Sequence, residues 1–246
     1  MSGYVKVVGL GPGAPDLVTP EVQRALDDAT DIVGYGPYVE RVPRRSGVRT
    51  HVSDNRQERQ RAQLALALAA AGSQVVVVSS GDPGVFAMAS AVFEVMDEHP
   101  QWQRVAVQVL PGVTAMLAAA ARVGAPLGHD FCVVNLSDNL KPWPLIERRV
   151  LAAVDTDMAL ALYNPRSNAR PDGFGRVLDL LQHRCEPARW VVLARAVYTP
   201  QESVRSLPLC QVSADMVDMR TLVIVGSSRT KRVGPFVYTP RQVTTA

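Results

Sequence analysis

The chain has 246 residues, of which 47% are hydrophobic, 20% are charged and 6% are aromatic, and its formal net charge is +3. This composition predicts a globular protein with one large or two smaller domains, and scattered basic residues with few aromatics argue against a nucleic-acid partner. Because no apolar run approaches the ~20 residues that cross a bilayer and no secretion signal precedes the first apolar run, we expect a cytoplasmic protein without a membrane partner.

Apolar runs bounded by turn residues alternate with helical patterns along the chain, which predicts an α/β fold. The expected strands are 4–10, 31–34, 74–79, 105–110, 131–136, 158–163, 190–194, 204–208 and 221–225. The expected helices between them are 20–29, 56–71, 86–98, 114–123, 144–154 and 174–184. The four valines of 75–78 are apolar on both faces, as expected for a strand with helices on both sides of its sheet.

A stretch rich in glycine and proline, 123–128, predicts a boundary between two α/β domains. We expect the first domain over 1–120, the second over 125–232 and a polar tail over 233–246. The cysteines lie far apart without the spacing of metal ligands, which indicates free thiols in a reducing compartment and no metal site. These cysteines are Cys132, Cys185 and Cys210.

The first strand ends in a glycine-rich loop, Gly9-Leu-Gly-Pro-Gly13, that superficially matches a dinucleotide-binding turn. In such a turn the helix starts at once, so that its N–H groups meet a phosphate. Here the helix is expected to begin later, with Thr19 as N-cap and Pro20 at its first position. Asp31 opens the second strand, so no acidic residue ends that strand to hold a ribose. The loop therefore predicts a rigid turn where a ligand approaches the backbone.

Three further loops follow expected strands, at 79–86, 110–115 and 162–166. Ligands of open α/β sheets bind beyond the carboxyl ends of the strands, where all four loops are expected to lie. Asp82 in the second loop suits hydrogen bonds from ligand hydroxyls, although a helix cap is an equally good interpretation of that residue.

Several stretches together resemble the tetrapyrrole methylase family, over nearly the whole chain from residue 8 to about residue 230. The most specific are VGLGPG (8–13) and SSGDPGVFAMAS (79–90). The others are VGYGPYVE (33–40), GHDFCVVNLSDNLKPW (128–143), ALYNPRS (161–167) and VDMRTLVIVGSS (217–228).

The resemblance implies two α/β domains with a cleft that binds S-adenosylmethionine (SAM), in a homodimer that releases S-adenosylhomocysteine. It implies methylation of a tetrapyrrole, precorrin-3B, at carbon 17, with ring contraction to precorrin-4 in cobalamin synthesis. Two alternatives remain: another precorrin or a cobalt-containing precorrin as substrate, and a non-catalytic protein that binds SAM or a tetrapyrrole.

The family pattern also implies which residues of this chain contact the cofactor. The implied cofactor-binding residues are Pro12, Ser80, Gly81, Asp82, Val85, Thr114, Ala115, Tyr163, Asn164 and Val197. Relatives that methylate uroporphyrinogen carry an acid directly after the first glycine turn, where this chain has Ala14, with Asp16 two residues on. That difference argues against uroporphyrinogen as the substrate.

Ring contraction involves a hydroxylated carbon, so we expect an acid or base beside the substrate. Our candidates are Asp138 and His129, although a helix cap for the first and a structural hydrogen bond for the second explain them equally well. Precorrins carry acetate and propionate groups, for which we expect substrate-binding residues. The candidate anchors for these carboxylates are Arg41, Arg44 and Arg166, and Asp16 is a further candidate substrate-binding residue.

Overall fold

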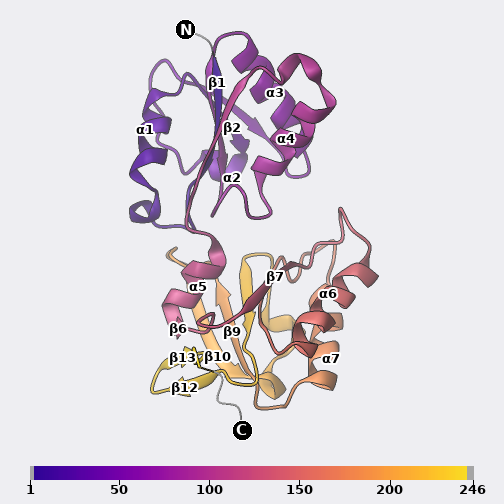
Figure 1. Ribbon diagram of the computed structural model, residues 1–246. Helices are drawn as coiled ribbons and strands as arrows, with labels where there is room; N and C mark the ends of the chain where they lie inside the picture. The colour runs from indigo at the N-terminus through magenta and orange to yellow at the C-terminus, as the bar shows by residue number, and fades with distance from the viewer. Residues whose placement is uncertain (1–2, 243–246) are drawn as a thin grey trace. The chain divides into compact units, whose positions relative to one another are not determined.

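The computed structural model describes residues 3–242, and the chain divides between Thr114 and Ala115 into two compact units (Figure 1). The division falls before the expected break at 123–128, because the helix that precedes this break packs on strands of the second unit. Each unit has its own sheet and helices, which confirms the α/β class.

The first unit contains a five-stranded, all-parallel sheet in the order β3-β2-β4-β1-β5. Its strands are β1 (Tyr4–Gly9), β2 (Asp31–Tyr35), β3 (Arg49–Ser53), β4 (Gln74–Ser79) and β5 (Ala106–Leu110). Its helices are α1 (Pro20–Asp28), α2 (Gly36–Val39), α3 (Glu58–Ala70) and α4 (Met88–Glu98), with 3-10 turns η1 (Pro15–Leu17) and η2 (Pro100–Trp102).

Alternate valines of the central strand β4 face opposite sides of this sheet. Val75 and Val77 belong to the core under α3 and α4, whereas Val76 and Val78 belong to the core under α1. Figure 1 shows α1 on one side of the strands and α3 and α4 on the other. The apolar run of β4 thus has the two-sided burial that its sequence predicts.

The start of α1 confirms the late helix expected after the glycine loop. The Thr19 hydroxyl accepts a hydrogen bond from the Val22 N–H at 3.3 Å, and Pro20 occupies the first turn. Between Gly13 and Thr19 the chain forms only the short turn η1. No helix N-terminus therefore directly follows the glycines of this loop, which excludes the phosphate-binding arrangement.

Asp31 at the start of β2 is fully buried and ties this strand to its neighbour β3. Its carboxylate accepts two hydrogen bonds from Arg49 and one from Thr30, all at 2.8 Å, and lies 2.8 Å from His51 Nε2. Burial alone would raise the pKa of Asp31, but the hydrogen bonds of Arg49, His51, Thr30 and Ser73 outweigh it and lower this pKa. The carboxylate therefore stabilises an edge strand that has few apolar residues.

The second unit contains a mixed five-stranded sheet in the order β10-β9-β11-β8-β7. Only β7 and β8 pair in parallel, and the other pairs are antiparallel. Its strands are β7 (Phe131–Asn135), β8 (Ala159–Tyr163), β9 (Trp190–Arg195), β10 (Ser203–Pro208) and β11 (Thr221–Val225). Its helices are α5 (Ala115–Val123), α6 (Trp143–Asp155) and α7 (Gly173–Arg184), with 3-10 turns η3 (Leu209–Gln211) and η4 (Ala214–Met216). Figure 1 shows α6 and α7 beside each other, away from α5.

The expected polar tail begins inside an ordered strand pair. A three-stranded sheet joins β12 (Lys231–Val233), β13 (Phe236–Tyr238) and β6 (Gly124–Ala125). Val237 is only 1% exposed, and the Thr239 hydroxyl donates to the Pro126 carbonyl at 2.6 Å. The last part of that expected tail, 243–246, lies outside the described residues.

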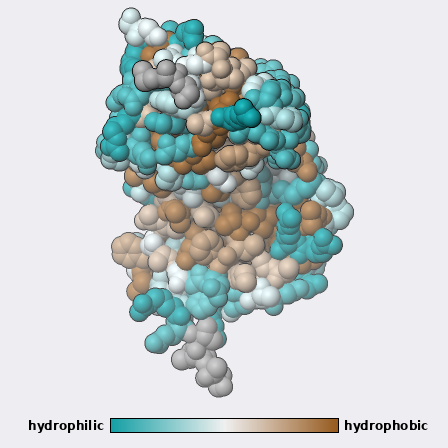
Figure 2. Space-filling view, turned by 45° about the horizontal axis from the view of Figure 1, so that its top comes forward, coloured by the Kyte–Doolittle hydropathy of each residue, from teal (hydrophilic) through white to brown (hydrophobic). Residues whose placement is uncertain are grey.

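Apolar side chains also reach the surface, and Figure 2 shows hydrophobic residues exposed among hydrophilic ones on one face. Leu140, Met219 and Phe236 are among the large apolar residues with high exposure. None of the helices within residues 3–242 combines the length and apolar character that a membrane crossing requires.

Candidate functional site

In the first unit, the loops after β1 and β4 are joined by backbone hydrogen bonds. The Gly11 N–H donates to the Gly81 carbonyl at 3.1 Å, and the Gly81 N–H donates back to the Gly11 carbonyl at 2.9 Å. Both glycines adopt positive φ, 65° and 61°, a conformation that residues with a side chain rarely adopt. Two motifs about seventy residues apart in sequence therefore form one rigid backbone surface at the carboxyl edge of the sheet.

The loop after β5 completes this surface at a contact that leaves no room for a side chain. A Cβ on Gly112 would lie 2.3 Å from the Gly81 carbonyl oxygen, and one on Gly9 would lie 2.4 Å from the same atom. We call Gly9, Gly11, Gly81 and Gly112 the glycine cluster. The three loops can pack backbone against backbone only because these positions lack side chains.

Asp82 connects the second and third loops through its carboxylate. Oδ1 accepts from the Gly84 N–H at 2.8 Å, and Oδ2 accepts from the Gly112 N–H at 3.0 Å. Asp82 therefore holds two loops together, and it does not cap α4, whose N-cap is Ala87. Each oxygen retains a further acceptor site, so the predicted contact with a ribose hydroxyl stays a prediction.

Arg41, expected as a substrate anchor, directs its guanidinium onto the first loop instead. Nη2 donates to the Leu10 carbonyl, and Nη1 donates to the Gly11 carbonyl at 3.1 Å and to Ser80 Oγ at 3.4 Å. A longer contact joins Nη2 to the Gly13 carbonyl at 3.5 Å. Burial lowers the pKa of Arg41, and this cost is offset by the carbonyl oxygens around it. We therefore assign Arg41 to holding the first loop in place.

The other predicted residues of the first unit differ in exposure. Pro12 and Val85 are half-buried, and Thr114 is buried with 5% of its surface exposed. Asp16 lies exposed in η1, and Arg44 is also exposed. The substrate-binding roles of Asp16 and Arg44, like the cofactor-binding roles of Pro12, Val85 and Thr114, stay predictions.

In the second unit, Tyr163 and Asn164 lie where the parallel strands β7 and β8 end. The Tyr163 hydroxyl accepts from the Met116 N–H at 3.0 Å and so caps the start of α5 beside Ala115. Asn164 has φ of 53°, and its Nδ2 donates to Asn135 Oδ1 at 3.0 Å. This strained residue joins the ends of both strands, and strain of this kind is concentrated at functional sites.

Val197, the last of the implied cofactor-binding residues, lies in a second strained turn, after β9. It is 4% exposed and lies between Ala196 and Tyr198, whose φ values are 49° and 61°. Because its side chain is buried, any ligand contact would use its backbone.

The two acid–base candidates lie at opposite ends of β7. His129 precedes this strand and accepts a hydrogen bond on Nδ1 from the Asp130 N–H at 2.7 Å, which realises the structural interpretation. Asp138 follows the strand, with Oδ1 3.7 Å from Arg170 Nε. A five-residue strand is roughly 17 Å long, so the two candidates do not act on one substrate atom.

Sequence reasoning missed Arg170 and named Arg166 in its place. Arg166 Nη1 contacts the Ala214 carbonyl at 3.4 Å and lies near Asp215, so it is engaged with η4. Arg170 and Lys141 lie instead close enough to Asp138 to interact with its carboxylate charge. The available signal was the position of both residues in loops that follow β7 and β8, and no motif marked them.

Comparisons with known proteins agree on one family. A sequence profile described as Tetrapyrrole (Corrin/Porphyrin) Methylases matches residues 5–212. The chain is 48% identical to the precorrin-3B C(17)-methyltransferase of Sinorhizobium sp., over 98% of this chain and 97% of that protein. It is 38% identical to a probable cobalt-factor III C(17)-methyltransferase of Salmonella typhimurium, over 98% and 99% of the two chains.

Solved structures give the same result. The crystal structure of the methyltransferase CobJ matches with a TM-score of 0.96 at 58% identity, over 97% of this chain and 100% of that chain. The uroporphyrin-III C-methyl transferase of Thermus thermophilus, complexed with S-adenyl homocysteine, matches with a TM-score of 0.71 at 25% identity, over 91% and 97% of the two chains.

Proposed function

Because this chain belongs to the tetrapyrrole methylase family, we propose that it transfers a methyl group from SAM to carbon 17 of precorrin-3B. The macrocycle contracts in the same reaction, which gives precorrin-4 on the route to cobalamin. The observation that carries this proposal is the 48% identity to the Sinorhizobium precorrin-3B C(17)-methyltransferase over nearly the full length of both chains.

The glycine cluster suits a cofactor with a ribose and an amino-acid part. Its loops pack backbone against backbone, as the 2.3 Å distance from a Gly112 Cβ to the Gly81 carbonyl oxygen illustrates, and so form a rigid surface at the carboxyl ends of the strands. When bound, SAM supplies a methyl group already activated on a sulfonium. The protein therefore has to hold the cofactor, align its methyl group with the substrate and exclude water. Rigid loops suit all three roles.

The SAM contacts that the family resemblance implies are proposed for each unit by itself. From the first unit these are Pro12, Ser80, Gly81, Asp82, Val85 and Thr114, and from the second Ala115, Tyr163, Asn164 and Val197. The rigid turns around Gly81 and Asn164, both at positive φ, support their part in this set.

For the proton transfers of ring contraction we propose Asp138. It follows β7 in the loop at the carboxyl end of this strand, and its side chain is 43% exposed. In Asp138→Asn we expect methyl transfer to continue while contraction slows by about 100-fold, because general acid–base groups contribute on this scale. Separate measurement of the methylated and the contracted product checks this. If Asp138→Asn contracts the macrocycle as fast as wild type does, Asp138 has no part in the mechanism.

A second candidate substrate is the cobalt-containing intermediate, since the Salmonella relative is named for cobalt-factor III. The higher identity to the precorrin-3B enzyme favours the metal-free substrate, 48% against 38%. A non-catalytic carrier is less well supported, because the relatives with full-length matches are named as methyltransferases.

We further propose that the enzyme acts as a homodimer in the cytoplasm, with the tetrapyrrole as its small-molecule partner and without nucleic acid or membrane partners. The three free thiols, Cys132, Cys185 and Cys210, support a reducing compartment. Light scattering after size-exclusion chromatography tests the dimer, and a monomer mass at micromolar concentration would contradict it.

The proposed activity is tested by incubating the protein with SAM and either precorrin-3B or cobalt-factor III. We expect precorrin-3B to gain one methyl group by mass spectrometry, with the change in absorbance that ring contraction causes. Faster methylation of cobalt-factor III would select the alternative substrate, and binding of SAM without any mass gain would select the carrier.

A further inference from the structure

Lys141, in the loop after β7, lies among positive charges from the loop after β8 and from α6. Lys141 Nζ donates to the Ser137 carbonyl at 3.1 Å. Burial lowers the pKa of Lys141, and the charges of Arg149 and Arg170 lower it further, against the opposing effect of Asp138. We call Lys141, Arg149 and Arg170 the basic cluster. One carboxylate among three cations leaves a local positive potential that favours an anion.

Arg170 carries a hydrogen-bond donor without an acceptor. Its side chain is 17% exposed, and its buried Nε is one of only two such side-chain atoms without a partner among residues 3–242. The nearest carboxylate oxygen, Asp138 Oδ1, is 3.7 Å away, beyond hydrogen-bond distance, and Nη2 contacts only the weakly accepting sulfur of Met219 at 3.8 Å. Buried donors are normally paired, and because Nε itself has no surface open to a ligand, the donor offered to an outside acceptor is the terminal Nη2, which has only this weak partner.

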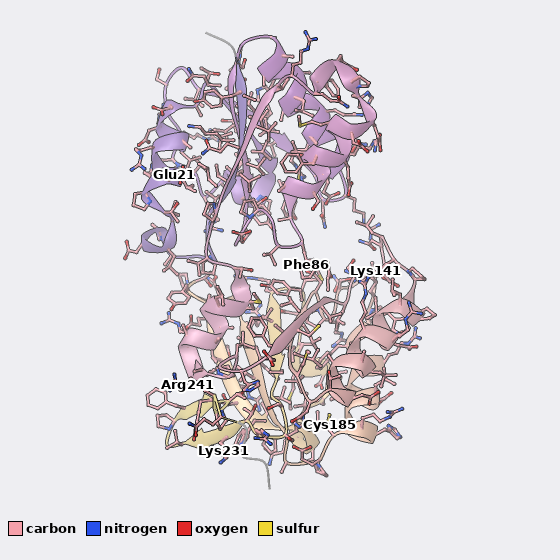
Figure 3. The ribbon with its side chains drawn as sticks, in the orientation of Figure 1. Glu21, Phe86, Lys141, Cys185, Lys231 and Arg241 are labelled. Carbon is pink, nitrogen blue, oxygen red and sulfur yellow. The ribbon has the colours of Figure 1, made fainter. Side chains whose placement is uncertain are left out.

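The basic cluster belongs to the same edge of the sheet as the proposed cofactor residues of the second unit. The carboxyl ends of β7 and β8 pair at Asn135 and Tyr163, and both loops of the cluster start there. Figure 3 shows Lys141 in the loop that leads from β7 to α6. Ligands of such sheets bind at this edge.

Apolar side chains accompany these charges. Leu140, next to Lys141, is 99% exposed, and Met219, which contacts Arg170, is 42% exposed. An apolar surface with guanidinium and ammonium groups fits a ligand with an apolar ring and peripheral carboxylates. Guanidinium groups in particular match the planar geometry of a carboxylate.

We propose that Lys141 and Arg170 bind acetate or propionate carboxylates at the periphery of the tetrapyrrole. This inference rests on the proposed function and names residues that hold its substrate. Arg170 Nη2 donates to a substrate carboxylate, Lys141 pairs with the same or a neighbouring one, and Arg149 adds positive potential. Asp138 stays beside Arg170 and fixes the position of its guanidinium.

The test compares Lys141→Gln and Arg170→Gln with Arg148→Gln, an exposed arginine on α6 that is absent from the charges acting on Lys141. We expect the KM for precorrin-3B to rise about 10-fold in each of the first two variants and to stay within twofold in the control, as loss of a charge-assisted hydrogen bond predicts. The dissociation constant for S-adenosylhomocysteine should stay unchanged in all three. Unchanged KM in both cluster variants would overturn the inference while leaving the proposed function intact.

A binding measurement separates this inference from the activity itself. Uroporphyrin, a porphyrin with acetate and propionate groups, is titrated while tryptophan fluorescence is followed, since Trp143 lies two residues after Lys141. If wild type fails to methylate precorrin-3B, the proposed function fails. Weaker uroporphyrin binding by the cluster variants than by Arg148→Gln would still support the carboxylate site. Equal binding by all variants, or none by wild type, would overturn it. Circular dichroism checks that each variant folds, and Lys141→Gln alone decides if Arg170→Gln unfolds.

Discussion

Replacement of Arg41 by glutamine should weaken cofactor binding without unfolding the first unit. Its guanidinium contacts three carbonyls of the loop after β1 and the Ser80 hydroxyl. Two of these four contacts, at 3.4 and 3.5 Å, are long, so we count only those to Leu10 and Gly11. Leu10 is 3% exposed, and water therefore replaces the lost donor poorly. At about 1 kcal/mol for each hydrogen bond, the ordered conformation of the loop loses about 2 kcal/mol of stabilisation.

If SAM binds to the ordered loop, this loss appears in affinity. A cost of about 2 kcal/mol corresponds to a roughly 30-fold higher dissociation constant. Isothermal titration of S-adenosylhomocysteine into Arg41→Gln measures it, with Arg44→Gln, an exposed neighbour, as the matched control. Arg41→Lys should give an intermediate value, because it keeps the charge with fewer donors. An affinity of Arg41→Gln within twofold of wild type would refute the role of Arg41 in holding the loop.

Two further changes test the glycine cluster and the first sheet. In Gly112→Ala the new Cβ must move the Gly81 carbonyl, at a cost of about 1–3 kcal/mol, so S-adenosylhomocysteine affinity should fall at least about 5-fold by titration. Gly175→Ala, whose Cβ has an ordinary contact at 3.8 Å, should bind normally, and equal losses in both would contradict a local effect. Because the pKa of folded Asp31 is lowered, its contribution to stability is present above the unfolded carboxyl pKa of about 3.9 and is lost as pH falls toward the folded value. Asp31→Asn should therefore lower the free energy of unfolding by about 3 kcal/mol at neutral pH and flatten its decline below about pH 5 in urea titrations, whereas parallel pH profiles would contradict the burial of a paired carboxylate.

The sequence predicted the first sheet well because local pattern and tertiary burial agree there. The valines of β4 are covered on both faces, and Thr19 and Pro20 mark the start of α1 without help from distant residues. The edge strand β3 was missed because it has few apolar residues and depends on Arg49 and Asp31, which are 18 residues apart.

In the second unit, strand positions were predictable but their directions were not. The apolar runs of β9 and β11 suit a parallel and an antiparallel sheet equally, so their sequence pattern does not predict strand direction. The connections between the strands decide the pairing. The strand β13 was missed because it depends on pairing with Gly124 and Ala125, far earlier in the chain.

The candidate site shows the same limit. Motifs identified the loops, because glycine and proline at strand ends have local causes. They did not reveal that Arg41 reaches back thirty residues to Gly11, nor that Asp82 accepts from Gly112. Arg170 escaped notice for the same reason, since its unpaired Nε depends on the folded loops around it.

The central claim, methylation at carbon 17 with ring contraction, is tested most directly by NMR of the product made with SAM labelled with carbon-13 in its methyl group. We predict one labelled methyl on carbon 17 of a contracted macrocycle whose extruded carbon is retained in an acetyl group. A label on any other carbon, or no labelled macrocycle at all, would contradict the proposed function.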